Sequence, residues 1–201
     1  MILAPLCRLV DAQQPADKVF TAPDGSFRFV YPSDFQVCTR DKTEPCTHSF
    51  IPACEEDPVV CVDYPAKEFK DTNFEAAAFQ IREIFHEEQM TPDVCVTPYP
   101  HKEVTGPSSW PDFLVSAEHP IEMIGGVQFL HGVSGGAATG HSISTDLYRA
   151  FHKGRCFELG VNQSATNPNM SDPPMKTITP AQQKKLQDTM SYILHSFRFS
   201  N

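Results

Sequence analysis

One serine in the chain sits in a pattern that nucleophilic serines use. Residues 132–136 read Gly-Val-Ser-Gly-Gly and satisfy G-x-S-x-G, the turn that lifts the serine of α/β-hydrolases between a strand and a helix. A strand is expected before this pattern, but the residues after it alternate like a second strand. We therefore favour a glycine-rich hairpin loop. The alternative hypothesis is a small secreted serine hydrolase with Ser134 as nucleophile and partners drawn from Asp146, Asp172, His152 and His195.

A second kind of chemistry would need the histidines, of which the chain has eight. His131, His141 and His152 fall in segments expected to be neighbouring strands, and converging neutral imidazoles bind zinc or copper. None of them shows the tight spacing of an H-x-H or H-E-x-x-H motif. We interpret them as solvated or packed side chains, and we predict no metal and no other cofactor.

The cysteines carry the clearest information about the environment of the protein. There are seven: Cys7, Cys38, Cys46, Cys54, Cys61, Cys95 and Cys156. No two of them form a C-x-x-C pair, so neither a zinc ribbon nor a thioredoxin-type redox site is indicated. Four of them lie in a polar, proline-containing segment, whereas free buried cysteines favour apolar runs. These features predict disulfide bonds.

The N-terminus agrees with an oxidising destination. Residues 1–10 are mostly apolar, and Val10-Asp11-Ala12 resembles a signal-peptide cleavage site. We expect residues 1–12 to be the remnant of a signal peptide, which would be removed together with Cys7. The six remaining cysteines can pair in many ways, and we prefer to keep the first four among themselves and to join Cys95 to Cys156. The predicted location is extracytoplasmic, either periplasmic or secreted.

The net charge and the hydropathy of the chain argue against some classes of binding partner. The chain has 201 residues, with 16 Lys and Arg against 25 Asp and Glu, and a formal net charge of −9. That field repels a nucleic-acid backbone and an anionic membrane surface, so neither is expected as a partner. No apolar run is long enough to cross a bilayer, and no membrane span is predicted. The length fits a single domain at 13–201.

The elements that would position these residues begin with short strands. Alternating aromatic residues predict a strand at 26–32, and a second short strand is expected at 35–39. A β-branched run predicts a third strand at 59–65. Between these strands lies a cysteine-rich insertion at 38–61.

Two helices are predicted from capping boxes. Thr72 and Glu75 form a T-x-x-E box, and the apolar residues after them recur at helical spacing, which predicts a helix over about 73–89. Near the C-terminus, Thr179-Pro180-Ala181-Gln182 supplies a cap, a first-turn proline and a closing glutamine, and it opens a second helix. A short strand at 196–199 ends the pattern.

Between the two helices we predict an irregular connection and an antiparallel meander. The connection spans 91–112 with a short strand around Cys95, and further strands are expected at 112–118, 126–133, 142–152 and 155–163. A tight turn at Lys153-Gly154 would pair His152 with Arg155, Phe151 with Cys156 and Arg149 with Glu158. The last pair is a favourable cross-strand charge pair. Large apolar residues on both faces indicate a sheet that is covered on both sides.

These elements give an α+β fold, an antiparallel β-sheet with helices packed on both faces. The chain has "YPSDF" after the first strand, "TNFEAAAF" at the first helix and "SFRF" at the end. In this order of elements it resembles the PsbP-like superfamily of small exported proteins over residues 26–199. The resemblance implies an α/β/α sandwich with a role in binding or assembly. The insertion at 38–61 departs from the family pattern, and no functional residue of the family is matched.

The sequence therefore predicts an exported, non-catalytic binding or assembly module. Its partner would be an unidentified protein or a small apolar ligand, the latter held in a pocket between sheet and helix. The hydrolase alternative requires a helix that begins directly after Gly136.

Overall fold

A computed structural model describes residues 16–40, 58–85, 90–96, 114–116 and 118–200. Several predictions lie outside the described residues: the signal-peptide remnant, Cys7, Cys46, Cys54 and most of the irregular connection after residue 96.

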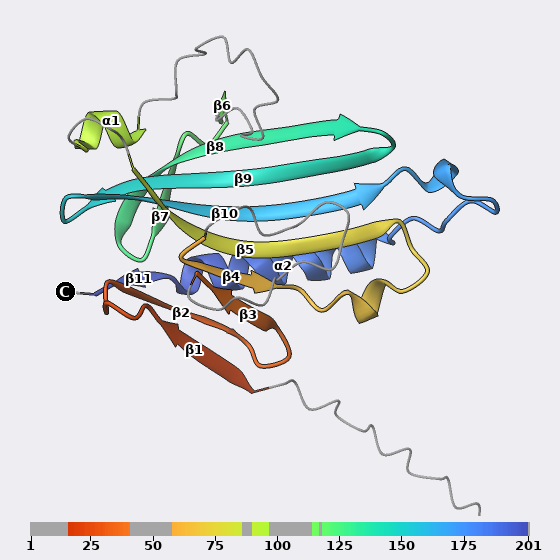
Figure 1. Cartoon of the computed structure of the whole chain (residues 1–201), viewed down its shortest axis with the longest axis horizontal. Helices are drawn as coiled ribbons and strands as arrows, with labels where there is room; N and C mark the ends of the chain where they lie inside the picture. Colours follow the sequence, from red (N-terminus) through yellow and green to blue (C-terminus); the bar gives the residue numbers. More distant parts are fainter. Residues whose placement is uncertain (1–15, 41–57, 86–89, 97–113, 117, 201) are drawn as a thin grey trace, which may run out of the picture.

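The described chain has two antiparallel sheets and belongs to the α+β class (Figure 1). The larger sheet runs in the order β3 (Gln36–Thr39), β4 (Val60–Asp63), β5 (Phe74–Ile84), β10 (Arg155–Thr166), β9 (His141–His152), β8 (Val127–Ala138) and β6 (Leu114–Val115). An eighth strand, β7 (Ile121–Ile124), pairs with β8 on the same side as β6. The smaller sheet contains β1 (Asp17–Thr21), β2 (Phe27–Pro32) and β11 (Arg198–Phe199).

The long helix α2 (Pro180–Ser196) runs along the larger sheet (Figure 1). Its predicted capping box is confirmed, because Gln182 N donates to Thr179 Oγ1 at 3.2 Å and Thr179 N donates to Gln182 Oε1 at 2.9 Å. Shorter helical segments are α1 (Pro92–Val96) and 3-10 turns at Ala66–Phe69 and Pro168–Met170.

The core lies between the larger sheet, α2 and the smaller sheet. The predicted aromatic strand is confirmed as β2, with Phe27 and Phe29 buried and Arg28 between them exposed. The rings of Phe29 and Phe79 pack edge to face with their centroids 5.2 Å apart. Phe27 contacts Phe157 in the same way at 6.1 Å. Each buried phenylalanine contributes roughly 1.5–3 kcal/mol, so this aromatic layer stabilises the packing of the smaller sheet on the larger one.

The predicted meander is confirmed, including its register. His152 pairs with Arg155, Phe151 with Cys156 and Arg149 with Glu158. The hairpin of β8 and β9 differs from the prediction, because the glycine-rich run at 132–136 belongs to strand β8 and not to a loop. The chain turns later, at Thr139-Gly140, where both residues have positive φ angles of 50° and 84°. Glycine adopts this conformation without steric cost, so the turn forms there.

The predicted helix over 73–89 is wrong, because Phe74–Ile84 form β5, a central strand of the larger sheet. β5 pairs with β4 on one side and β10 on the other. Phe79 and Ile81 pack toward α2, while Gln80 and Arg82 are buried on the opposite face. A strand buried on both faces carries apolar residues in nearly every position, and such a run also satisfies helical spacing.

The two residues of the first capping box have other partners. Thr72 Oγ1 donates to Phe69 O at 2.6 Å and accepts from Phe74 N at 3.3 Å, so it closes a turn before β5. Glu75 Oε1 hydrogen-bonds His141 and Thr166. The T-x-x-E pattern therefore marks a strand start here.

The predicted strand around Cys95 is also wrong, because Cys95 lies in the helix α1. Within the predicted strand at 112–118, the described residues Leu114 and Val115 form β6. α1 lies on the face of the larger sheet opposite α2, since it is bonded to Cys156, whose side chain points away from the α2 core. The predicted helices on both faces are therefore not confirmed: in the described part of the chain α2 covers one face, and the other face carries only the five-residue α1.

Candidate functional site

Ser134 lies inside β8, directly opposite Thr145 of β9. β8 continues through Gly135 and Gly136 to Ala138, so no helix follows the G-x-S-x-G pattern. The strand-turn-helix geometry that exposes a nucleophilic serine is absent at this position.

The expected partners of Ser134 are not brought to it. His152 stands seven residues beyond Thr145 on β9, which corresponds to about 23 Å along the strand, and it points to the opposite face. Asp146 Oδ1 lies 3.0 Å from Nε2 of His131 instead. The remaining two candidates lie elsewhere: His195 is on α2, and Asp172 is an exposed residue after the second 3-10 turn.

The three histidines considered for a metal site also lie apart, each with its own partner. His131 pairs with Asp146, and His141 Nδ1 lies 2.5 Å from Glu75 Oε1. The ring of His152 stacks on Phe199 with centroids 4.1 Å apart, and burial together with Lys153 lowers the pKa of this imidazole. Within the part of the chain that the structure describes, no group of three or more His, Cys, Asp or Glu could hold a metal ion.

A buried charge network occupies the face of the larger sheet that points away from α2. Glu158 on β10 lies directly opposite Arg82 on β5 and Arg149 on β9, so the register places all three in one row. Arg149 Nε donates to Glu158 Oε2 at 2.6 Å, and Arg82 Nε donates to Glu158 Oε1 at 3.1 Å. All three side chains are almost completely buried. The carboxylate is therefore held by two guanidinium groups away from solvent.

The charge network belongs to a larger buried surface that we call the polar face. Its members are Arg82, Arg149, Glu158, Gln80, Asn162, Thr145 and Ser164, all buried. Among the residues that the structure describes, the buried hydroxyls of Thr145 and Ser164 have no hydrogen-bond partner. The polar face is stabilised by the hydrogen bonds of its charge network, whereas the face that packs on α2 is stabilised by apolar contacts.

Asp63 extends the polar face onto β4. It lies opposite Ala78, which in turn lies opposite Asn162, and the row continues through Thr145 to Ser134. Burial raises the pKa of Asp63 to about 7. Its carboxyl group can therefore gain or lose a proton near neutral pH, which an ordinary aspartate does not do.

A surface hollow of about 250 Å³ lies beside His152. It is lined by Asp24, Gly25, Ser26, His152, Lys153, Arg155, Phe157 and Ser200. Arg155 Nη1 donates to Asp24 at 2.6 Å and its Nε donates to Glu83 at 2.7 Å, while Lys153 Nζ donates to the carbonyl of Ser200 at 3.3 Å. The contacts with Asp24 and Ser200 join the smaller sheet to the β9–β10 turn, and the contact with Glu83 joins this turn to β5, so the hollow is a junction between elements.

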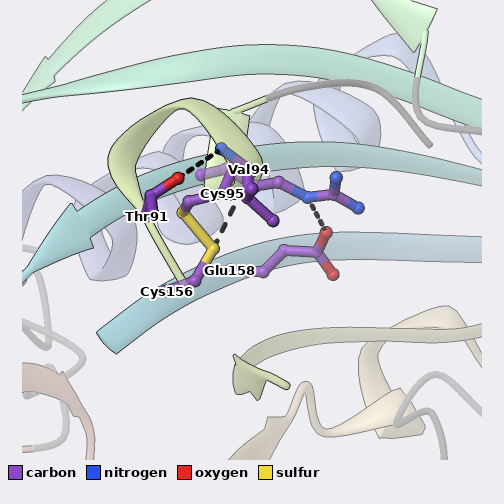
Figure 2. The surroundings of a disulfide bond; sticks show 6 residues. Thr91, Val94, Cys95, Cys156 and Glu158 are labelled. Atoms are coloured by element: carbon purple, nitrogen blue, oxygen red, sulfur yellow. Dashed lines mark hydrogen bonds and ion pairs between the residues drawn. A yellow bond between two sulfur atoms is a disulfide. The ribbon is translucent and has the colours of Figure 1, made fainter. Parts of the chain in front are cut away.

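The disulfide between Cys95 and Cys156 fixes α1 to β10 beside the charge network (Figure 2). The Cα atoms of the two cysteines are 5.4 Å apart, and Glu158 follows Cys156 two residues later on the same strand. The same pairing is the one preferred from the sequence. Cys38 and Cys61 are disulfide-bonded as well.

No protein-family model and no curated protein matches the chain. Among solved structures, it is similar to LpqN of Mycobacterium tuberculosis, described as involved in cell envelope biogenesis, with 13% identity over 92% of this chain and 91% of that one and a TM-score of 0.46. A Bacteroides thetaiotaomicron structure has 12% identity over 92% of this chain and 48% of that one, with a TM-score of 0.44.

The solution structure of cyanobacterial PsbP from Synechocystis is also similar. Its identity is 9% over 98% of this chain and all of that chain, with a TM-score of 0.40. The chain thus has a weak resemblance to PsbP-like proteins.

No helix among the described residues is long and apolar enough to cross a membrane.

Sequence reasoning found part of the polar face. The cross-strand pair of Arg149 and Glu158 follows from the turn at Lys153-Gly154 and is confirmed. Arg82 is missed because the prediction of a helix over 73–89 does not place it in the sheet. Asp63 was missed because it lies near the end of a short strand, and no local pattern signals its burial.

Proposed function

We propose that this protein is an exported, non-catalytic binding or assembly module that folds in an oxidising compartment outside the cytoplasm. The observation that carries the proposal is the state of the cysteines. All four cysteines within the described residues, Cys38, Cys61, Cys95 and Cys156, are disulfide-bonded. Stable structural disulfides form in the periplasm and in secreted proteins, and they are rare in the reducing cytosol.

The non-catalytic part of the proposal rests on the position of Ser134. This residue lies in the middle of a regular strand, and its expected acid and base partners are far away or bound to other groups. A nucleophilic serine needs its base within hydrogen-bond reach.

The space between α2 and the larger sheet does not favour the small apolar ligand that the sequence analysis considered. Phe27, Phe79 and Phe157 are fully buried there, with Leu186 and Ile193 of α2 packed against them. These side chains fill the layer that such a ligand would occupy. A protein partner that binds the surface is therefore the preferred form of the proposal.

The compartment is tested by counting free thiols. The native protein is isolated from the source cells by fractionation, denatured without reductant and reacted with a maleimide, and its peptides are identified by mass spectrometry. We expect Cys38, Cys61, Cys95 and Cys156 to be unlabelled and the protein to be in an extracytoplasmic fraction. A chain expressed in a reducing cytosol is the matched control and should be labelled. Labelling of all four in the native protein would overturn the proposal.

The absence of catalysis is tested separately. Ester hydrolysis is measured for the wild type and for Ser134→Ala, with Ser144→Ala on the neighbouring strand as control. We expect no hydrolysis above background in any of the three. Activity that is present in the wild type and lost only in Ser134→Ala would establish the hydrolase instead.

A further inference from the structure

His131 connects three segments near the edge of the larger sheet that β6 and β7 form. From its place on β8, its Nε2 lies 3.0 Å from Asp146 Oδ1 on β9, and its Nδ1 lies 3.0 Å from the carbonyl oxygen of His119, in the chain between β6 and β7. The ring stacks on Tyr148 with centroids 4.6 Å apart and planes 6° from parallel. The imidazole is only 12% exposed.

The two partners of the ring determine how many protons it must carry. A backbone carbonyl and a carboxylate both accept hydrogen bonds and donate none. Both ring nitrogens of His131 therefore have to donate, and only the positively charged imidazolium has a hydrogen on each nitrogen. A neutral imidazole would keep one of these bonds and would turn a lone pair toward the other oxygen at 3.0 Å.

The same residue also anchors the chain through its backbone. His131 N donates to Pro120 O at 2.9 Å, and Ser116 N donates to His131 O at 3.0 Å. His119 N donates to Ser116 Oγ at 3.2 Å. The side chain and the backbone of His131 thus bind Ser116, His119 and Pro120 to β8.

The other titratable groups around the ring come from several elements. They are Asp146 and Tyr148 on β9, His119 before β7, and Glu122 on β7, which lies 3.9 Å from His195 of α2. Burial, together with Asp146 and Glu122, raises the pKa of Tyr148 well above its usual range, so this phenol stays neutral. Imidazole is the side chain that changes charge between about pH 5 and 8.

We propose that His131 is a pH-sensitive clasp. In its charged form it bridges Asp146 and the His119 carbonyl and fixes the Ser116, His119 and Pro120 contacts on β8. When it loses its proton, one of the two bonds is lost and these contacts loosen. The contacts that the clasp fixes lie next to β6 and β7, which pair with β8, so its release changes how this edge of the sheet is presented. The inference does not depend on the compartment of the protein.

The clasp is tested by nuclear magnetic resonance on the wild-type protein. Long-range nitrogen-proton spectra at pH 5.5 and 8.0 report whether each ring nitrogen of His131 carries a hydrogen. Hydrogen exchange of the Ser116 and His131 amides is measured at the same pH values and expressed as a protection factor. We expect two ring N–H groups at pH 5.5, one at pH 8.0, and protection that falls by about tenfold between them, the effect of one charge-assisted bond.

Two variants separate the clasp from a general effect of pH. In Asp146→Asn the carboxamide can donate to a neutral ring, so the protection of these amides should become nearly independent of pH. His131→Gln should lose the pH dependence as well. Asp188→Asn on α2 is the matched control, because its carboxylate pairs with Lys184 and lies away from the clasp.

Any of three results would overturn the proposal: a single ring N–H at pH 5.5, two ring N–H groups still present at pH 8.0, or the same pH dependence in Asp146→Asn as in the wild type. If His131→Gln does not fold, the wild-type spectra and Asp146→Asn still decide. Thiol labelling tests the proposed function and is not affected by any of these outcomes.

Discussion

Asp63 has a pKa well above that of an exposed aspartate. Burial raises its pKa to about 7, so near pH 6 the folded protein holds a proton that the unfolded chain has released. The resulting stabilisation is fully present below about pH 4 and is lost as the pH rises through 7. We expect Asp63→Asn to become more stable relative to the wild type as the pH is raised from 5 to 8.

Urea unfolding of both proteins at the two pH values measures this difference. Asp188→Asn is the control, since this carboxylate is exposed on α2 and should show no such trend. A difference between Asp63→Asn and the wild type that stays constant from pH 5 to 8 would show that Asp63 is charged in the fold throughout this range.

Single residues also show where sequence reasoning reaches its limit. Arg149 and Glu158 could be paired from the sequence, because a two-residue turn fixes the register of the hairpin around it. Arg82 could not be added, because its contact with Glu158 joins residues 76 positions apart. Contacts of this length depend on the order of strands in the sheet, which no local pattern contains.

Two elements begin with the same kind of capping pattern and form different structures. The segment after Thr179 has an exposed polar side and one apolar side, so it forms the helix α2. The segment after Thr72 has no exposed residue from 73 to 84, because β4, β10 and the core cover it. A helix in this place would leave β4 and β10 without their common neighbour. Tertiary pairing therefore overrides the local helix signal.

The cap of α2 can be tested by a single change. Thr179→Ala removes the acceptor of the Gln182 amide and one side of the capping box, and we expect it to lower the free energy of unfolding by about 1 kcal/mol. Thr177→Ala is the matched control, because Thr177 is exposed and precedes the helix. Thermal or urea unfolding measures both. Equal stability of the two variants would show that the cap adds nothing to the fold.

At the scale of the whole molecule, the larger sheet divides the protein into two chemically different sides. One side is the aromatic core under α2, which the alternation of the strands predicts. The other is the polar face, where Glu158, Asn162 and Ser164 lie on the same side of β10. Such alternation ordinarily indicates a solvent-exposed side. Their burial therefore could not be predicted from β10 alone.

The disulfide between Cys95 and Cys156 ties this second side together, because it links α1 to β10 across 61 positions of the sequence. Opening a loop of this length releases conformational entropy in the unfolded chain, and the double variant Cys95→Ala with Cys156→Ala should lose about 4 kcal/mol of unfolding free energy. Both positions are buried and alanine is slightly smaller than cysteine, so little of this loss is due to packing.

Urea unfolding without reductant measures the loss of stability in the double variant. Hydrogen exchange of the backbone amide at position 95, in the wild type and in the variant, reports whether α1 has detached, since this amide donates to Thr91 O at 2.9 Å in the folded helix. The single variants should lose a similar amount, because either one opens the same loop. A loss below about 1 kcal/mol, with the amide still protected, would mean that α1 is held by its contacts with β9 and β10 and that the disulfide only secures it.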